Sequence, residues 1–443
     1  MKNLIFWLLL SAAAGPLYAQ SGVSSIPILS LNEEEYGRFE ALYKWFHANG
    51  ELSNQEFNVS RKMKAELRQL GFEIKTLGKF PGFLALYDNG GDKETWYWRV
   101  ELDSNPHKEA ESTGVDFASK VRTTLNGDSV WVVNSCGHSL HQGVALAAAH
   151  LLVKNKHLWT GNKLGIIVEH AEEVGNGSSD LIQAGIFELF GAPDGILSMH
   201  NSAEISAGKV AVVAGAVPMM PLVMNVDIEV QAENGCHVGE HYKCVDVNLL
   251  AAQILVRLQE IKSRLLHPVT EPAILGCGRI YGGTRRNIHP LSCTMEFSIR
   301  CYTPEVRDKI MSRLRQIAEG EAMAAGAPMP RITAFEAVPA LYNDPELGKK
   351  VIASFEKSLG REHIIPYHPV MLAEPFSKYG LTKERVPILM FWLGAAKDKC
   401  DESSDSHHEC SGLHSPDFLP DYPVALRTGA TAVANAFINL FND

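Results

Sequence analysis

Three short apolar runs, at Val130–Val133, Leu164–Val168 and Gly195–Met199, most constrain the fold of this chain. Each is as long as a strand and carries almost no polar residue, which is typical of strands covered on both faces of a parallel sheet. A helical segment at Gly143–Val153 separates the first two, and Glu33–Asn49 has aromatic residues at helical spacing. The alternation predicts an α/β fold with a mostly parallel sheet between helices.

The pattern changes near Pro221, where an alternating strand begins. The elements expected from there are strand Val223–Val230, helix Val245–Leu265, strands Ala273–Tyr281 and Ser292–Tyr302, helix Pro304–Ala324 and strand Arg331–Ala337. This β-α-β-β-α-β order is that of a small ferredoxin-like α+β domain. We therefore expect a discontinuous larger domain, at 20–220 and 339–443, interrupted by a smaller one at 221–338.

The first residues have the pattern of an export signal. Lys2 precedes the apolar run Leu4–Leu10, and small residues lead to Ala19. The run is too short to span a bilayer stably, so we expect a signal peptide at 1–19 and a periplasmic or secreted protein. A short membrane anchor is the alternative. No later run reaches the roughly 18 apolar residues of a spanning helix, so stable membrane insertion is not expected.

Charge and cysteine content limit the partners and crosslinks. Asp and Glu number 51 against 41 Lys and Arg, and no basic run stands out, so neither a nucleic-acid partner nor an anionic membrane surface is expected. Eight cysteines are too few for a disulfide scaffold in a chain of 443 residues. Cys400 and Cys410, which flank an acidic stretch, form the best candidate pair, and the other pairings stay open.

Potential metal ligands follow the three apolar runs. Cys136 and His138 come after the first, and at i and i+2 of an extended chain they would point to the same side. Glu172 and Glu173 come after the second run, and His200 closes the third. His414 lies near the end of the chain. Each has an ordinary alternative: a buried thiol beside a core histidine, a solvated acidic loop, or a structural histidine.

Together these residues indicate a metal site. The carboxyl ends of parallel strands share one edge of a sheet, where such folds bind ligands. Five ligands, Cys136, His138, Glu173, His200 and His414, exceed the four of one tetrahedral zinc and fit two ions. The thiolate favours zinc over magnesium or calcium. Glu172 stays free to act as a general base.

Six motifs spread along the chain look like those of one known family. They are Glu51-Leu52-Ser53 with Gln55-Glu56, Cys136-Gly137-His138 with His141, His170-Ala171-Glu172-Glu173, Met199-His200, Gly282-Gly283-Thr284 with Asn287 and Pro290, and Leu413-His414-Ser415-Pro416. With these motifs the chain resembles the two-metal peptidase/amidohydrolase superfamily of the aminoacylases. It is most similar to the branch of hippurate hydrolases and auxin-conjugate hydrolases, over nearly the whole mature chain.

The resemblance implies a role for each matched residue. Cys136, His138, Glu173, His200 and His414 would hold two divalent ions, zinc or manganese, and Glu172 would be the base that takes a proton from metal-activated water. His237 would reach the active site of a partner subunit and stabilise the developing oxyanion, and Asn287 would help to hold the substrate carboxylate. The larger domain would be catalytic, and the smaller one would serve as lid and dimerisation domain in a homodimer. The implied reaction is hydrolysis of N-acyl amino acids or related small amides.

Several departures from the family pattern keep other functions open. Ser139 replaces the acid that usually follows Cys-Gly-His, Glu101 lengthens an acid of the strand before Asp103, and Glu374-Pro375 replaces an acid pair. Because of these changes we also consider that the protein is a descendant of the same fold that binds a metal or ligand without catalysis. A cysteine hydrolase that uses Cys136 is a further alternative. The stretch from 398 to 411 resembles an insertion, which is either a disulfide-pinned flap or a solvated loop.

Overall fold

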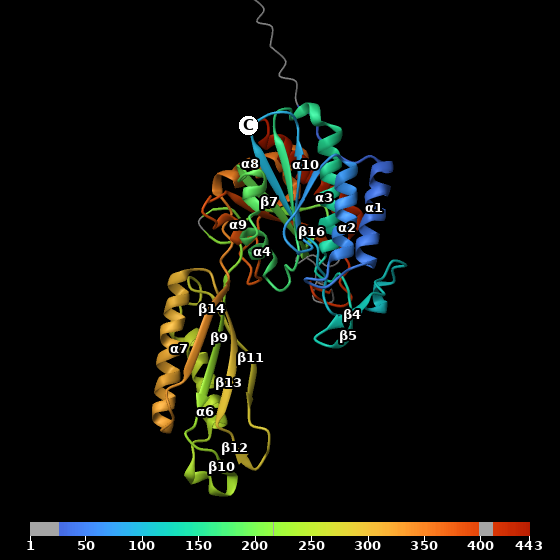
Figure 1. The fold of residues 1–443 in the computed structure, drawn as a ribbon. Coiled ribbons are helices and arrows are strands. Elements are labelled where there is room, and N and C mark those ends of the chain that lie inside the picture. The colour runs from blue at the N-terminus through green and yellow to red at the C-terminus, as the bar shows by residue number, and fades with distance from the viewer. Residues whose placement is uncertain (1–25, 216, 398–410) are drawn as a thin grey trace, which may run out of the picture.

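The structure, a computed structural model, describes residues 26–215, 217–397 and 411–443. An eight-stranded sheet of order β1-β2-β6-β3-β7-β16-β8-β15 dominates the larger part (Figure 1). Its strands are β1 Glu73–Thr76, β2 Phe83–Asp88, β3 Thr95–Glu101, β6 Lys163–Glu169, β7 Gly195–Ser206, β8 Val210–Ala211, β15 Ile364–Ile365 and β16 Ile388–Ala396. The central pairs β6–β3, β3–β7 and β7–β16 are parallel, so the predicted mostly parallel sheet between helices is confirmed.

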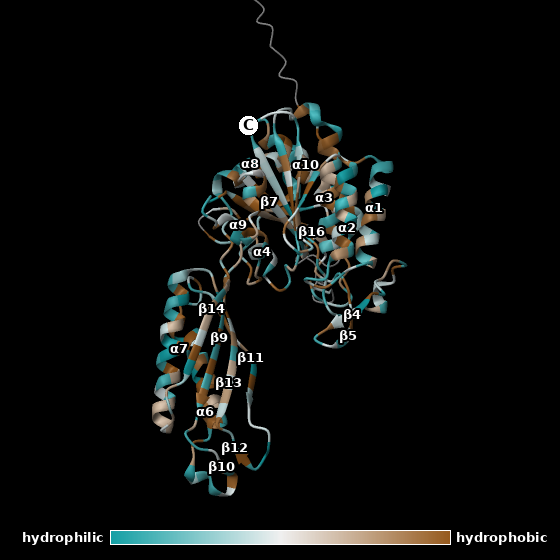
Figure 2. Cartoon of the chain, viewed as in Figure 1, coloured by the Kyte–Doolittle hydropathy of each residue, from teal (hydrophilic) through white to brown (hydrophobic). Residues whose placement is uncertain are grey.

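Helices cover both faces of this sheet. One face packs in a single core with α1, α2, α3, α8 and α10, and the other face packs with α4, α5 and α9. The bounds are α1 Glu33–Ala48, α2 Phe57–Gln69, α3 His138–Lys154, α4 Gly177–Gln183, α5 Ile186–Phe190, α8 Pro345–Ser358, α9 Ser377–Gly380 and α10 Tyr422–Leu440. Every residue of β16 is buried, as expected for a strand covered on both faces. Apolar colour marks the central strands and α10 in Figure 2.

A second sheet lies apart from the first, below it in Figure 1. It is antiparallel, of order β11-β13-β9-β14, and the helices α6 and α7 pack on one of its faces. Its elements are β9 Leu222–Gln231, α6 Val247–Glu260, β11 Ala273–Gly282, β13 Ser292–Cys301, α7 Pro304–Ala325 and β14 Arg331–Val338. Thr303 caps α7 and Pro304 begins it, where the missing proline N–H costs nothing. The predicted β-α-β-β-α-β order is therefore present, while the division into domains at 220/221 and 338/339 stays a prediction.

The far tip of this second part is formed by a small two-stranded element. β10 Cys236–His237 pairs with β12 Ile288–His289, away from the large sheet in Figure 1. A disulfide joins Cys236 to Cys244 across the exposed segment that follows β10. This pairing was left open by the sequence analysis. The predicted pair Cys400–Cys410 and the signal peptide at 1–19 lie outside the described residues.

The predicted central strand at Val130–Val133 is wrong. β5 Asp128–Trp131 instead forms a separate antiparallel hairpin with β4 Arg122–Leu125. Asn126 and Gly127, with φ of 53° and 92°, make the turn, and Asn-Gly is the strongest short hairpin signal in a sequence. The preference of Asn-Gly for a hairpin turn decided the local structure here, and the apolar run did not. In the part of the chain that the structure describes, no helix is both long and apolar enough to cross a bilayer.

Candidate metal centre

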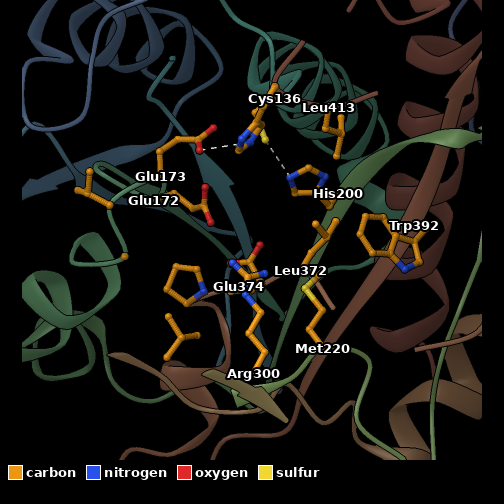
Figure 3. Close-up of a pocket in the computed structure, with 16 residues that line it drawn as sticks. Cys136, Glu172, Glu173, His200, Met220, Arg300, Leu372, Glu374, Trp392 and Leu413 are labelled. Atoms are coloured by element: carbon orange, nitrogen blue, oxygen red, sulfur yellow. Dashed lines mark hydrogen bonds and ion pairs between the residues drawn. The ribbon is translucent and has the colours of Figure 1, made fainter. Parts of the chain in front are cut away.

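A pocket of about 430 Å³ opens at the carboxyl-terminal edge of the central strands. Four of the five predicted ligands and both parts of the fold contribute to its wall, and Glu172 lines it as well. Figure 3 shows Cys136, Glu173 and His200 facing one another across one side of this pocket. Trp392, Leu372 and Met220 form an apolar side, and Arg300 enters from β13. The remaining ligand, His138, is fully buried and is not among the residues that line the pocket.

Cys136 and His138 converge through a turn, not through an extended chain as the i, i+2 argument assumed. Gly137 has φ of +87° and is the residue before α3, so that His138 is the first residue of that helix. A Cβ at Gly137 would collide with the side chain of Asn201, so this turn requires glycine. The sharp bend aims both side chains at the same point.

The two adjacent acids lie on a constrained turn after β6. Ala171 has φ of +51°, and its N–H donates to Glu56 Oε1 at 2.6 Å. The N–H of Glu173 donates to Asp103 Oδ2 at 2.9 Å, and Ser53 Oγ donates to the same oxygen at 2.7 Å. Ser53 and Glu56 belong to the first motif, so its function in this chain is to support the acidic turn.

His200 and His414 complete the predicted set. His200 lies within β7 and not at its end, because this strand continues to Ser206. Its Nε2 is 3.4 Å from Cys136 Sγ. His414 has φ of +66°, and its N–H donates to the carbonyl of Ser135 at 2.9 Å, which places its Nε2 3.4 Å from Glu173 Oε2.

The donors form two triads that share one sulfur. Among the described residues, the ligand atoms of Cys136, His138 and His200 lie within 4.8 Å of one another, and so do those of Cys136, Glu173 and His414. All five predicted ligands are therefore brought together. Asp103, His138 and Glu172 form a third such group, so Asp103 is a candidate that the sequence did not single out as a ligand. Its place just after β3, at the same sheet edge, was the available signal.

The hydrogen bonds of two histidines leave their Nε2 atoms directed to the ligand cluster. His138 Nδ1 donates to the carbonyl of Asp103 at 2.9 Å and His200 Nδ1 donates to that of Asn201 at 2.8 Å, which leaves each Nε2 with a free lone pair. His138 Nε2 and Glu173 Oε1 are buried and have no hydrogen-bond partner among the described residues. Burial also lowers the pKa of His200 well below its usual value and so favours neutral imidazole. These residues fit divalent cations of the zinc type.

Glu172 is the acid in the best position to move protons. Its Oε2 is 3.7 Å from His138 Nε2, and its side chain lines the pocket. Burial raises the pKa of Glu172 well above its usual range, and the negative charges of Glu374 and Glu173 act in the same direction. A carboxyl group with a raised pKa accepts a proton more readily than an exposed one, as a general base must.

A model of the peptidase family M20/M25/M40 matches residues 97–428. The chain belongs to this family. It is therefore a metal-dependent hydrolase of amide or peptide bonds, and the superfamily resemblance seen in the sequence is confirmed. This assignment replaces the two alternatives that the sequence left open, a non-catalytic descendant of the family and a cysteine hydrolase.

Several M20 relatives cover most of the chain. An N-acetyl-L-cysteine deacetylase of Bacillus subtilis is 29% identical over 82% of this chain and 80% of its own length. A thermostable carboxypeptidase of Saccharolobus solfataricus is 27% identical over 80% of this chain and 84% of its own. A solved structure from Bacillus subtilis, described as a dinuclear metal-binding M20 peptidase, has a TM-score of 0.75 at 23% identity, covering 93% of this chain and 99% of its own.

The departures from the M20 pattern have local replacements here. Ser139 is buried, and its Oγ has no hydrogen-bond partner within the described part of the chain. A carboxylate still lies beside His138, because Oδ1 of Asp103, which matches the family pattern, is 3.4 Å from His138 Nδ1. The longer Glu101 reaches His141, with 2.7 Å between Oε2 and Nδ1, and His141 Nε2 accepts the N–H of Asn201. His141 thereby supports the strand that carries His200.

A buried charge cluster lies under the pocket. Arg99, fully buried on β3, pairs with Glu101, with Glu169 at 2.8 Å and with Glu374 at 3.0 Å. Tyr379 donates to the same Glu169 oxygen at 2.9 Å. One guanidinium thus opposes three carboxylates, and burial raises the pKa of Glu374 to about 7. Glu374, the one acid that stands where the family has an acid pair, is held in the pocket wall by Arg99.

We expect Arg99→Leu to destabilise the protein by about 3–5 kcal/mol, because three buried carboxyl groups would lose their cation. Urea unfolding followed by circular dichroism at pH 7 measures this change. The control is Arg331→Leu, whose ion pair with Glu229 is on the surface and should shift the midpoint little. A loss no larger than that of the control would show that the cluster is held together without Arg99.

His237 and Asn287 are not among the residues that line the pocket of their own chain. They lie together at the far tip, where the N–H of Val238 donates to the carbonyl of Asn287 at 3.1 Å. Their predicted roles, for His237 in the active site of a partner subunit and for Asn287 at the substrate carboxylate, stay predictions.

Proposed function

We propose that this protein is an exported hydrolase of N-acyl amino acids that works as a homodimer with two divalent metal ions. The observation that carries the proposal is the pair of triads around one pocket, joined at Cys136. Cys136, His138, Glu173, His200 and His414 would hold the ions, zinc or manganese. The M20 relatives include a deacetylase of an N-acetyl amino acid and a structure described as dinuclear, which supports both parts of the proposal.

When bound, the two cations would supply Lewis-acid polarisation and a lowered pKa of water. The chain's own residues then divide the remaining work. Glu172 takes a proton at its carboxylate and delivers it to the leaving nitrogen of the amide. His237 of the partner subunit donates a hydrogen bond to the carbonyl oxygen as charge develops there. Asp103 and the carbonyl of Asn201 hold His138 and His200 in the tautomer that leaves Nε2 free.

The pocket wall favours a small substrate with a carboxylate and an apolar part. Arg300 is the only Lys or Arg among the described lining residues, and its Nη1 donates to the carbonyl of Met371 at 2.5 Å, which anchors the guanidinium. A planar guanidinium suits a substrate carboxylate. Leu372, Met220 and Trp392 provide an apolar surface for an acyl group or side chain. Asn287 of the partner subunit would assist Arg300.

Export and dimerisation rest on separate observations. The Cys236–Cys244 disulfide favours an oxidising compartment and so supports the signal peptide proposed at 1–19. The remote position of His237 supports a lid and dimerisation role for 221–338, since a second copy could bring that residue to the pocket without any movement of the tip. The catalytic domain would comprise 20–220 and 339–443.

Metal removal tests the central part of the proposal. We expect the purified protein to hold about two divalent ions per chain and to release acetate from N-acetyl amino acids. Dialysis against a chelator should remove metal and activity together, and zinc or manganese should restore both. Emission spectrometry measures the metal, and acetate release measures the activity. Activity that stays after the metal is gone would refute the proposal.

A further inference from the structure

The segment that carries His237 is closed by a covalent ring. The disulfide joins Cys236, the residue before His237, to Cys244. Between them, residues 238–243 form an exposed 3-10 segment without a buried side chain, and Glu240 breaks its helical geometry. Two sets of main-chain contacts tie this segment to the chain around β12. One is the pairing of β10 with β12, and the other is the hydrogen bond from the N–H of Val238 to the carbonyl of Asn287. Packing alone therefore holds the segment weakly.

The ring fixes the tautomer of His237 as well as its place. The N–H of Gly239, inside the ring, donates to His237 Nδ1 at 3.1 Å. A neutral imidazole that accepts at Nδ1 carries its proton at Nε2. His237 is exposed, so its Nε2–H is then available as a hydrogen-bond donor to another molecule. Loss of the ring would free Gly239 and with it the contact that selects this tautomer.

We infer that the Cys236–Cys244 disulfide is a positioning element for His237, so that the oxidised pair is needed for full turnover. The inference rests on the proposed role of His237 in the site of the partner subunit. The disulfide restricts the conformations of the loop that carries His237. Less conformational entropy is then lost when His237 binds the developing oxyanion. Reduction by a dithiol would break the S–S bond and leave two thiols, while the dithiol becomes a disulfide.

The test compares Cys236→Ser/Cys244→Ser with His237→Ala and with the triple variant. We expect the double cysteine variant to lose about tenfold in kcat with little change in KM, and His237→Ala to lose roughly 10²-fold or more. The triple variant should be no slower than His237→Ala, because the disulfide acts through that residue. Cys277→Ser, at a free cysteine on β11 of the same part of the fold, is the matched control and should keep full activity.

Reduction of the native protein gives a second measurement in case the double variant folds poorly. A phosphine should lower kcat of the wild type to the level of the double variant, and reoxidation should restore it. The double variant should not respond to the phosphine. Metal content, melting temperature and dimer content, measured for each sample, separate turnover from unfolding.

Three results would contradict these expectations in distinguishable ways. A double cysteine variant with wild-type kcat would overturn the inference while leaving His237 in its role. A tenfold loss that persists in full on the His237→Ala background would also overturn it, since the disulfide would then act elsewhere. A His237→Ala variant with normal kcat would instead remove the proposed role of His237, on which the inference depends.

Discussion

Glu172→Gln should abolish most of the turnover while leaving the metal in place. The amide keeps the shape of the carboxyl group but cannot accept a proton, so we expect kcat to fall by about 10²–10⁴-fold. The proposed ligand set does not include Glu172, and therefore the variant should bind as much metal as the wild type. Steady-state hydrolysis of an N-acetyl amino acid and metal analysis of the same samples measure the two effects.

The neighbouring acid provides the matched control. Glu173→Gln changes a proposed ligand, whose Oε1 is buried without a hydrogen-bond partner, and should lose both metal and activity. The opposite pattern would contradict our assignment: Glu172→Gln losing metal would favour the third group, in which Asp103, His138 and Glu172 share an ion. Turnover of Glu172→Gln within tenfold of the wild type would remove it as the base.

The sequence was sufficient to predict which ligand residues lie together, because their meeting depends on the order of the strands in the sheet more than on local geometry. β6 and β7 are both neighbours of β3, so the residues that follow or lie within them share an edge. Cys136 reaches this edge by another route. The strand predicted at Val130–Val133 was wrong, but the predicted ligand set did not depend on it. The turn at Gly137, at the start of α3, brings Cys136 and His138 to the same place.

The sequence could not predict the support around the ligands. The cluster of Arg99 with Glu101, Glu169 and Glu374 joins residues up to 275 positions apart, and nothing in local periodicity connects them. The Cys236–Cys244 ring has a short spacing, but pairing requires that the loop between them turns back, which depends on the β10–β12 pairing. Contacts of this kind are set by tertiary structure and appear only once the strands are placed.

The dimer can be tested by mixing two inactive variants. In the proposed arrangement each pocket uses its own Glu172 and His237 of the partner subunit. A mixed dimer of Glu172→Gln and His237→Ala therefore has one pocket with both residues intact and one with neither. If subunits exchange at random, half of the dimers are mixed, so that activity should recover to about one quarter of the wild-type value. Each variant alone should stay at least about 10²-fold below wild type.

The two copies must be refolded or co-expressed together, because a stable dimer does not exchange subunits on simple mixing. Co-expression of Glu172→Gln with Glu173→Gln is the matched control: both changes lie in the same pocket, so each chain brings one defective pocket and no recovery is expected.

Recovery in the first mixture but not in the second requires that His237 acts across the dimer. Absence of recovery, with mixed dimers demonstrated by differential tags, would place the function of His237 within its own chain, where the tip would have to swing toward the pocket. The expected quarter of activity thus tests the dimer and the route by which a residue so far from its own pocket takes part in the reaction.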